Sequence, residues 1–117
     1  YEQKAIVTEE GIHIGWMDLK NIDKLNKHAE LGIAIGDKNY WGKGFGLAAM
    51  KEMLLWGFSE LGLNKIWLRV EVDNEKAIKS YKRAGFVDEG ILRQDRLRNG
   101  EFVDRLRLSI LKQEFFN

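Results

Sequence analysis

Three alternating glycines, Gly42, Gly44 and Gly46, form the stretch of this sequence best suited to bind a ligand. They follow an apolar run that stops at Gly36 and precede a segment, Leu47 to Leu61, with apolar residues at helical spacing. The first amides of a helix have no partner within the helix, and its dipole favours an anion there. Glycines let the backbone close around such an anion. The pattern therefore predicts a phosphate-binding turn.

Two common phosphate-binding motifs do not fit this turn. A P-loop requires Lys and then Ser or Thr after its last glycine, whereas Gly46 is followed by Leu47 and Ala48. The dinucleotide pattern G-x-G-x-x-G fails because Gly46 comes one residue early. No acidic residue ends a following strand at the expected distance of about 20 residues. The phosphate must therefore belong to another kind of ligand.

Three pieces of sequence, taken together and in order, resemble the GNAT superfamily of acetyl-CoA-dependent N-acetyltransferases: 41–46 (WGKGFG), 72–78 (VDNEKAI) and 81–86 (YKRAGF). The similarity runs from about Tyr1 to Phe115 and is to the branch with ribosomal-protein N-terminal acetyltransferases and bacterial spermidine N-acetyltransferases. The wider family usually has Gln or Arg in place of Trp41, and this branch often does not. The resemblance implies an α+β fold with antiparallel arms, a central parallel strand pair and flanking helices. It also implies that a first strand and a helix pair normally precede Tyr1.

The resemblance further implies where acetyl-CoA would bind. Main-chain amides of the glycine turn would hold the pyrophosphate, with a charge added by Lys43. The pantetheine arm would pair with the strand at residues 33–35 as an added strand. Asn74 would hydrogen-bond to this arm, although a helix cap explains Asn74 equally well, and surface charge is the competing explanation for Lys82 and Arg83. The predicted coenzyme-binding residues are Ile33, Ala34, Ile35, Gly42, Lys43, Gly44, Phe45, Gly46, Leu47, Asn74, Lys82 and Arg83.

Tyr81 is the catalytic acid that the resemblance implies. Attack of an amine on a thioester expels a thiolate, whose conjugate acid has a pKa of ~8.5. A positioned phenol can protonate that sulfur as it leaves. A lone Tyr is more often simply packed on its helix face, so both explanations stand at this level. The oxyanion would be stabilised by a main-chain amide of the strand at residues 33–35.

A general base is also required, because an alkyl ammonium has a pKa of ~10.4 and must lose a proton before it attacks. Glu30, just before the strand at 33–35, is the first candidate, and Glu71 is the second. A solvated charge on a strand face explains either residue equally well. His13 and His28 could carry protons, although a lone His is more often structural.

The predicted elements place these residues at one edge of a mixed sheet. A strand, helix and strand between Ile33 and Val72 form a right-handed crossover, and ligands bind beyond the carboxyl ends of such parallel strands. The glycine turn and Asn74 should therefore meet there. Predicted strands cover 1–8, 12–19, 28–35, 65–72, 86–96 and 102–111, predicted helices cover 47–61 and 74–84, and 20–27 is expected to be a loop. The alternation of Ile66, Leu68 and Val70 supports the strand at 65–72. Gly62 and Gly85 are expected to end the two helices, and Asn99-Gly100 to form a hairpin turn.

The composition limits the possible functions. The 117 residues suffice for one domain, and 19 basic against 18 acidic residues give a net charge of +1, so bulk charge attracts neither nucleic acid nor membrane. The lack of Cys excludes disulfides and a thiol nucleophile and fits a cytoplasmic protein. Two separated His residues without Cys predict no metal site.

We therefore expect a cytoplasmic N-acetyltransferase that transfers the acetyl group of acetyl-CoA to a primary amine by direct attack. The acceptor could be a polyamine, a protein N-terminus or a small amine. A non-catalytic acyl-CoA-binding or regulatory module is the alternative. A weaker third possibility is an RNA-associated domain, suggested by Arg93, Arg96, Arg98, Arg105 and Arg107. We expect these arginines instead to form cross-strand ion pairs with the interleaved Asp95, Glu101 and Asp104. Because the elements expected before Tyr1 are absent from this sequence, we predict that a second copy covers the exposed surface.

Overall fold

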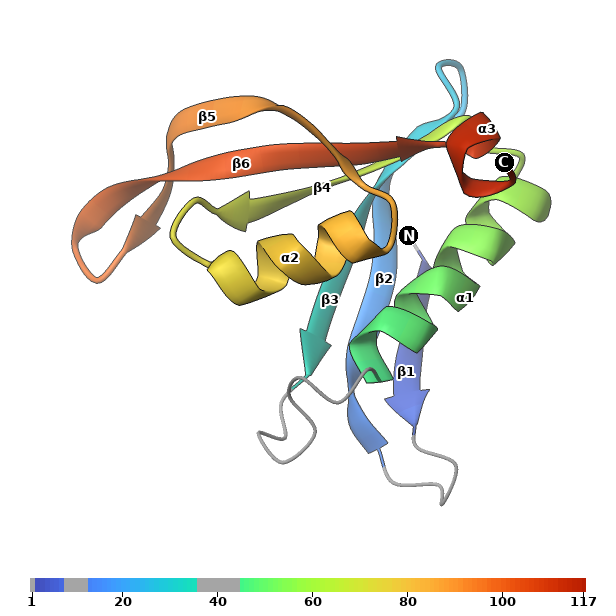
Figure 1. Ribbon diagram of the computed structural model, residues 1–117, viewed down its shortest axis with the longest axis horizontal. Coiled ribbons are helices and arrows are strands. Elements are labelled where there is room, and N and C mark those ends of the chain that lie inside the picture. Colours follow the sequence, from blue (N-terminus) through green and yellow to red (C-terminus); the bar gives the residue numbers. More distant parts are fainter. Residues whose placement is uncertain (1, 8–12, 36–44) are drawn as a thin grey trace.

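The computed structural model describes residues 2–7, 13–35 and 45–117, and side chains from Trp16 to Ile33 and from Leu47 onwards (Figure 1). A six-stranded sheet has the order β1-β2-β3-β4-β6-β5. Among the residues described, one pair of neighbouring strands, β3 with β4, is parallel, and the other four pairs are antiparallel. The strands are β1 (Glu2–Val7), β2 (His13–Asp23), β3 (His28–Ile35), β4 (Lys65–Glu71), β5 (Val87–Arg98) and β6 (Glu101–Leu111); the helices are α1 (Phe45–Ser59), α2 (Glu75–Arg83) and α3 (Lys112–Phe115). The predicted mixed α+β sheet is thus confirmed.

Helices α1 and α2 cover one face of this sheet (Figure 1). Strand β4 alternates between buried Ile66, Leu68 and Val70 and the partly exposed side chains between them. The buried set joins side chains of α1 and β6 in one core, and Ala77, Ile78 and Tyr81 of α2 pack against it. The opposite face of β4 carries Trp67, Arg69 and Glu71 and is therefore the polar face of the sheet.

The ends of the helices follow the predicted signals. Gly62, with φ +67°, lies just after α1, and the amide of Leu63 donates to the carbonyl of Gly57 at 3.1 Å. A glycine in the left-handed region with such a bond is a common helix stop. Asn74 caps α2, and Gly85 follows it with φ +108°.

One strand boundary was predicted wrongly and one short helix was missed. β2 continues to Asp23, so Lys20 to Asp23 are strand and only the turn before His28 remains of the expected loop. Asp23 itself makes that turn, because its Oδ1 accepts from the amides of Leu25 and Asn26 at 3.1 and 2.9 Å. Helix α3 was not predicted; Phe115 on it packs on Phe58 of α1, with ring centroids 5.5 Å apart.

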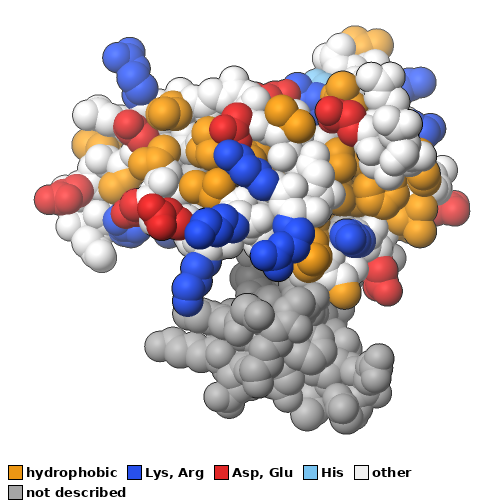
Figure 2. Space-filling view, in the orientation of Figure 1, with side chains coloured by type: hydrophobic (Ala, Val, Ile, Leu, Met, Phe, Trp, Pro, Cys, Tyr) orange, Lys and Arg blue, Asp and Glu red, His pale blue; other side chains and the backbone are white. Residues whose placement is uncertain are grey.

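The hairpin of β5 and β6 extends beyond the helices as an arm (Figure 1). Its turn is the predicted Asn99-Gly100, with φ +51° and +80°. Ile91, Leu97 and Phe102 on this arm are all exposed. Figure 2 shows hydrophobic side chains gathered over this arm, with basic and acidic side chains interspersed around them.

Candidate functional site

The parallel strands β3 and β4 separate part-way along their length. Their register pairs run from His28↔Lys65 to Glu30↔Trp67 and, among the described residues, end there. β3 nevertheless continues to Ile35 and β4 to Glu71, and Figure 1 shows the two strands diverging. On its other edge β3 stays paired with β2 as far as Ile35. Backbone N–H and C=O groups of residues 31–35 therefore face the opening, where an extended chain carrying amides could pair with them.

The predicted glycine turn follows β3. Gly42, Lys43 and Gly44 lie outside the described residues, as does Trp41. Phe45 and Gly46 are the first residues of α1, followed by the partly buried Leu47. The helix thus begins at Phe45, two residues before the predicted start, and takes Gly46 into its first turn, so its first-turn amides belong to the glycine stretch, as the predicted anion site requires.

Tyr81 lies on α2 and is partly buried against the core. Its ring meets Phe86 edge-on, with centroids 6.1 Å apart. Burial raises the pKa of the Tyr81 phenol above its ordinary value of 10.0. The hydroxyl therefore keeps its proton at neutral pH, which a proton donor to a leaving thiolate needs.

Asn74 is exposed at the start of α2, and its Oδ1 accepts a hydrogen bond from the amide of Ala77 at 3.3 Å. The cap explanation is thus confirmed, and it uses the side-chain oxygen. The amide nitrogen is a donor of the kind that a carbonyl of an extended ligand could accept from. At the other end of α2, Lys82 and Arg83 are exposed, and Lys82 lies 3.4 Å from an Asp88 oxygen.

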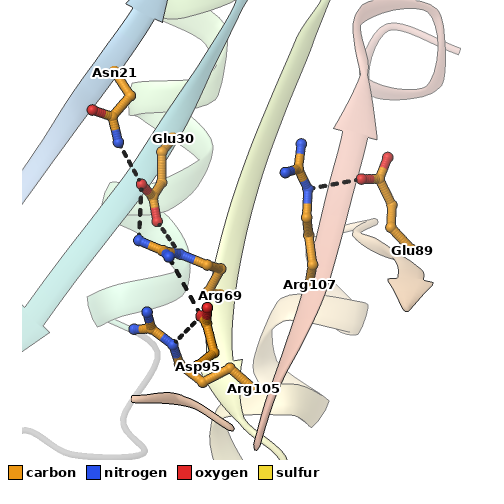
Figure 3. A network of polar contacts seen from close by, with 7 residues as sticks. All are labelled: Asn21, Glu30, Arg69, Glu89, Asp95, Arg105 and Arg107. Atoms are coloured by element: carbon orange, nitrogen blue, oxygen red, sulfur yellow. Dashed lines mark hydrogen bonds and ion pairs between the residues drawn. The ribbon is translucent and has the colours of Figure 1, made fainter. Parts of the chain in front are cut away.

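Glu30 lies at the point where β3 leaves β4, and it is buried. Its Oε2 accepts from Arg69 Nε at 2.9 Å, and its Oε1 accepts from Asn21 Nδ2 at 2.8 Å and from Arg69 Nη2 at 3.4 Å (Figure 3). Each carboxylate oxygen can accept two hydrogen bonds, so Oε2 keeps one lone pair for a water molecule.

Glu71, the second candidate base, lies at the end of β4 between two arginines of the arm. Arg96 Nη1 donates to it at 2.9 Å, and Arg98 forms a second ion pair with it and reaches Asp73 at 3.4 Å. The expectation that these arginines pair across strands is confirmed for Arg105 with Asp95, at 2.8 Å. It is also confirmed for Arg107, although its partner is Glu89 and not one of the predicted acids. For Arg96 and Arg98 the partners were predicted wrongly, because they are Glu71 at the end of β4 and, for Arg98, also Asp73.

The structure brings the strand at 33–35 and Glu30 to the same opening, while Asn74 and Tyr81 follow β4 on α2. His28 lies at the opposite, closed end of the strand pair. Asn21 and Arg69, which contact Glu30, were missed in the sequence. The alternation along β4 could have pointed to Arg69, because it places Arg69 on the same face as Glu71.

The part of the chain that the structure describes shows neither a metal-binding cluster nor a membrane-spanning helix. No group of three or more His, Asp or Glu side chains there is arranged to hold a metal ion. None of the helices described is long and apolar enough to cross a membrane.

Residues 2–87 match the family model of the acetyltransferase (GNAT) domain, so the chain belongs to the GNAT acetyltransferase family.

Relatives with described activities are similar over most of this chain. A spermidine N(1)-acetyltransferase of Vibrio cholerae is 36% identical over 104 residues, which cover 89% of this chain and 60% of the relative. A putative ribosomal N-acetyltransferase of Bacillus subtilis is 36% identical over 106 residues, covering 91% of this chain and 57% of the relative. A crystal structure of the spermidine/spermine N-acetyltransferase SpeG from Vibrio cholerae superimposes with a TM-score of 0.91 at 33% identity, covering 98% of this chain and 67% of that one. The chain spans about three fifths of the length of the curated relatives it matches.

Proposed function

We propose that this protein transfers the acetyl group of acetyl-CoA to a primary amine. The observation that carries the proposal is the opening between β3 and β4, where β3 stays paired on one edge and offers its other edge to an extended ligand. The pantetheine arm of coenzyme A is such a ligand, since it is an extended chain with two amides. Membership of the acetyltransferase family supports the same activity.

In the proposed reaction the amine nitrogen attacks the thioester carbonyl carbon directly, without an acyl-enzyme. A main-chain amide of residues 33–35 stabilises the oxyanion. The carbon–sulfur bond then breaks with its electron pair on sulfur, and the Tyr81 hydroxyl supplies the proton that converts the thiolate to a thiol. The nitrogen, which becomes positively charged in the attack, loses its extra proton to water as the neutral amide forms, and the Tyr81 phenolate recovers a proton from water. The raised pKa of Tyr81 supports this role because the acid is fully protonated before the reaction.

Glu30 is the proposed general base, and it acts through a water molecule. Its contacts with Arg69 and Asn21 leave room for one more hydrogen bond at Oε2, so a bound water could pass the ammonium proton to it. Replacement of Glu30 by Gln keeps a similar shape and removes the proton acceptor. We expect this variant to lose rate most strongly below the pKa of the acceptor amine, where the amine must be deprotonated on the enzyme.

The remaining predictions concern partners and binding residues. The amides of residues 42–47, together with Lys43, Asn74, Lys82 and Arg83, are proposed to bind the coenzyme. A polyamine is the first acceptor to test, because the names of two relatives specify spermidine. A protein N-terminus is the second, since another relative is named as a putative ribosomal N-acetyltransferase. A cytoplasmic location and a homodimer stay predictions.

The test follows thiol release from acetyl-CoA with a panel of acceptors: spermidine, a peptide with a free N-terminus and an amino acid. Hydrogen exchange with and without coenzyme A provides a second readout. We expect thiol release with at least one acceptor and slower exchange in residues 31–35 with coenzyme A. Coenzyme binding without thiol release from any acceptor would favour the non-catalytic module. No binding and no protection would overturn the proposal.

A further inference from the structure

Arg69 crosses from β4 to β3 immediately beyond the last register pair. If the parallel ladder continued past Glu30↔Trp67, Arg69 would face Gly32. Gly32 has no side chain, and a Cβ atom there would lie 2.5 Å from Asp18 Oδ1, so the Asp18 carboxylate lies directly over it. Arg69 reaches back to Glu30 instead, with Nε 2.9 Å from Oε2 and Nη2 3.4 Å from Oε1. A side-chain contact thus replaces the backbone bonds where the strands separate.

The same guanidinium also contacts the arm. Its Nη1 lies 3.4 Å from Asp95 Oδ2, and Arg105 Nε donates to the same oxygen at 2.8 Å (Figure 3). Asn21 of β2 completes the set at Glu30 Oε1. These contacts link β2, β3, β4, β5 and β6 across the polar face, and we call Asn21, Glu30, Arg69, Asp95 and Arg105 the polar strut. Arg69 is the member that touches both sides of the opening.

We propose that Arg69 is a positioning residue that sets the width of the opening and the orientation of Glu30. This rests on the proposed function, because the opening is the proposed seat of the coenzyme arm. The Glu30 side chain is 5% exposed and that of Arg69 27%. A pair this well shielded has a defined geometry, unlike mobile ion pairs at the surface. The planar fork of Arg binds two carboxylates at fixed angles, which a Lys ammonium does not do.

The chain offers a matched control in Arg107. Its Nε donates to Glu89 Oε1 at 3.0 Å, and its side chain is 29% exposed (Figure 3). This pair joins neighbouring strands β5 and β6, which stay paired on both sides of it. Arg107 also lies over the Trp67 ring, 3.9 Å from its centroid. Arg69 lies over the same ring, 5.5 Å from its centroid, so replacement of Arg107 disturbs the same face of the sheet but leaves the Arg69–Glu30 pair in place.

The experiment measures coenzyme A affinity by calorimetry, and kcat and KM for acetyl-CoA, in Arg69→Met, Arg69→Lys and Arg107→Met. We expect Arg69→Met to weaken coenzyme A binding and raise KM by about tenfold or more, the effect of losing a charged contact. We expect Arg69→Lys to recover part of that loss and Arg107→Met to stay within about twofold of the wild type. Equal losses in Arg69→Met and Arg107→Met, or no loss in Arg69→Met, would overturn the proposal.

A double variant protects the test from misfolding, because Arg69→Met alone leaves the Glu30 charge buried without its partner. Arg69→Met with Glu30→Gln removes both charges, and its coenzyme A affinity should fall as far as that of Arg69→Met. Affinity restored to the wild-type level in the double variant would mean that the lone charge caused the loss, and would overturn the proposal. A wild-type protein without affinity for coenzyme A would overturn the proposed function and this inference together. Normal affinity in Arg69→Met beside a binding wild type would overturn this inference alone.

Discussion

The two edges of β4 are held in different ways. Towards β6 the ladder runs along the whole strand, from Lys65↔Leu111 to Glu71↔Arg105. Towards β3 it stops at Glu30↔Trp67, and the contact of Arg69 with Glu30 takes over. In a continuous ladder the backbone N–H and C=O groups are hydrogen-bonded within the sheet, so none is available to a ligand. The interrupted edge keeps backbone groups for a ligand and depends on side chains for its geometry. We expect binding and catalysis at the second edge.

The largest expected effect is on stability, and it tests whether the two edges of β4 differ only in backbone pairing or also in core packing. Leu31 lies on β3 just beyond the last register pair and Leu108 lies on β6, and both are buried in the same core. Replacement of either by Ala should lower the free energy of unfolding by about 2–5 kcal/mol through lost burial and a cavity. Urea unfolding measures it. Ile91→Ala, at an exposed position of β5, should stay within about 0.5 kcal/mol. A cost below about 1 kcal/mol for Leu31→Ala alone would mean that the core itself is loose at the opening.

The next effect concerns chemistry on the open side. Tyr81→Phe should lower kcat by about 10²-fold or more, because only the proton donor is removed. Coenzyme A affinity should be unchanged, as the ring packing on Phe86 is retained. In the wild type, ionisation of Tyr81 should cause no fall in kcat below about pH 10, since burial raises its pKa. Steady-state rates from pH 6 to about pH 10 check both statements. A Tyr81→Phe enzyme with the wild-type kcat would exclude Tyr81 as the acid.

A smaller effect separates the two roles of Asn74. Asn74→Ala removes the cap of α2 and should cost about 1 kcal/mol of stability. Asn74→Asp keeps an acceptor for the Ala77 amide and should preserve the stability, while it loses the amide donor proposed to bind the ligand. Thermal unfolding and calorimetry with coenzyme A give the two readouts. If Asn74→Asp binds coenzyme A as well as the wild type does, Asn74 caps α2 and its side-chain amide does not bind the coenzyme.

The smallest expected effect is a pH-dependent change in stability at Glu89, on β5, which is paired with β6 on both sides of this residue. Burial by itself raises the pKa of Glu89, but contacts with Lys65, Ser109 and Arg107 outweigh it, so the pKa lies below its ordinary value of 4.5. The folded protein therefore binds fewer protons here than the unfolded chain. This contribution to stability is present above about pH 4.5 and is lost as the pH falls through the folded pKa.

Glu89→Gln tests this by comparison of melting temperatures between about pH 7 and pH 3. The variant should melt on the order of 2 °C below the wild type at neutral pH, since the pair is partly exposed. The difference should shrink towards zero at the acid end. A difference that stays constant with pH would mean that Glu89 contributes by shape and not by charge.

The sequence predicted what is local and periodic. The alternation of Ile66, Leu68 and Val70 predicted β4 and its buried face, and Asn74 and Gly62 predicted helix ends. Strand β2 was cut short because Lys20 and Asn21 look like loop residues, and Asn21 has φ +52° at a register shift. Pairing with β3 keeps them in the sheet, so tertiary contacts override local preference there.

The polar strut could not be predicted in the same way. Glu30 and Arg69 are separated by 39 positions along the chain, and no periodic signal connects them. Glu30 was singled out for its place before the strand, but its partners depend on how far β3 and β4 run together. The point where a parallel ladder ends is set by the whole sheet and not by the residues at that point.

The edge strand β5 contains two irregularities that reduce the tendency of this chain to aggregate. Its register with β6 shifts between Asp88 and Gly90 and again between Leu92 and Arg96. Gln94 has φ +49° in the second shift, where its amide donates to Asp104 at 2.7 Å. An edge strand with exposed apolar residues can pair with strands of other molecules, and bulges disrupt the regular hydrogen-bonding edge that such pairing needs. The kinks in β5 therefore protect an apolar arm from growing into fibrillar aggregates.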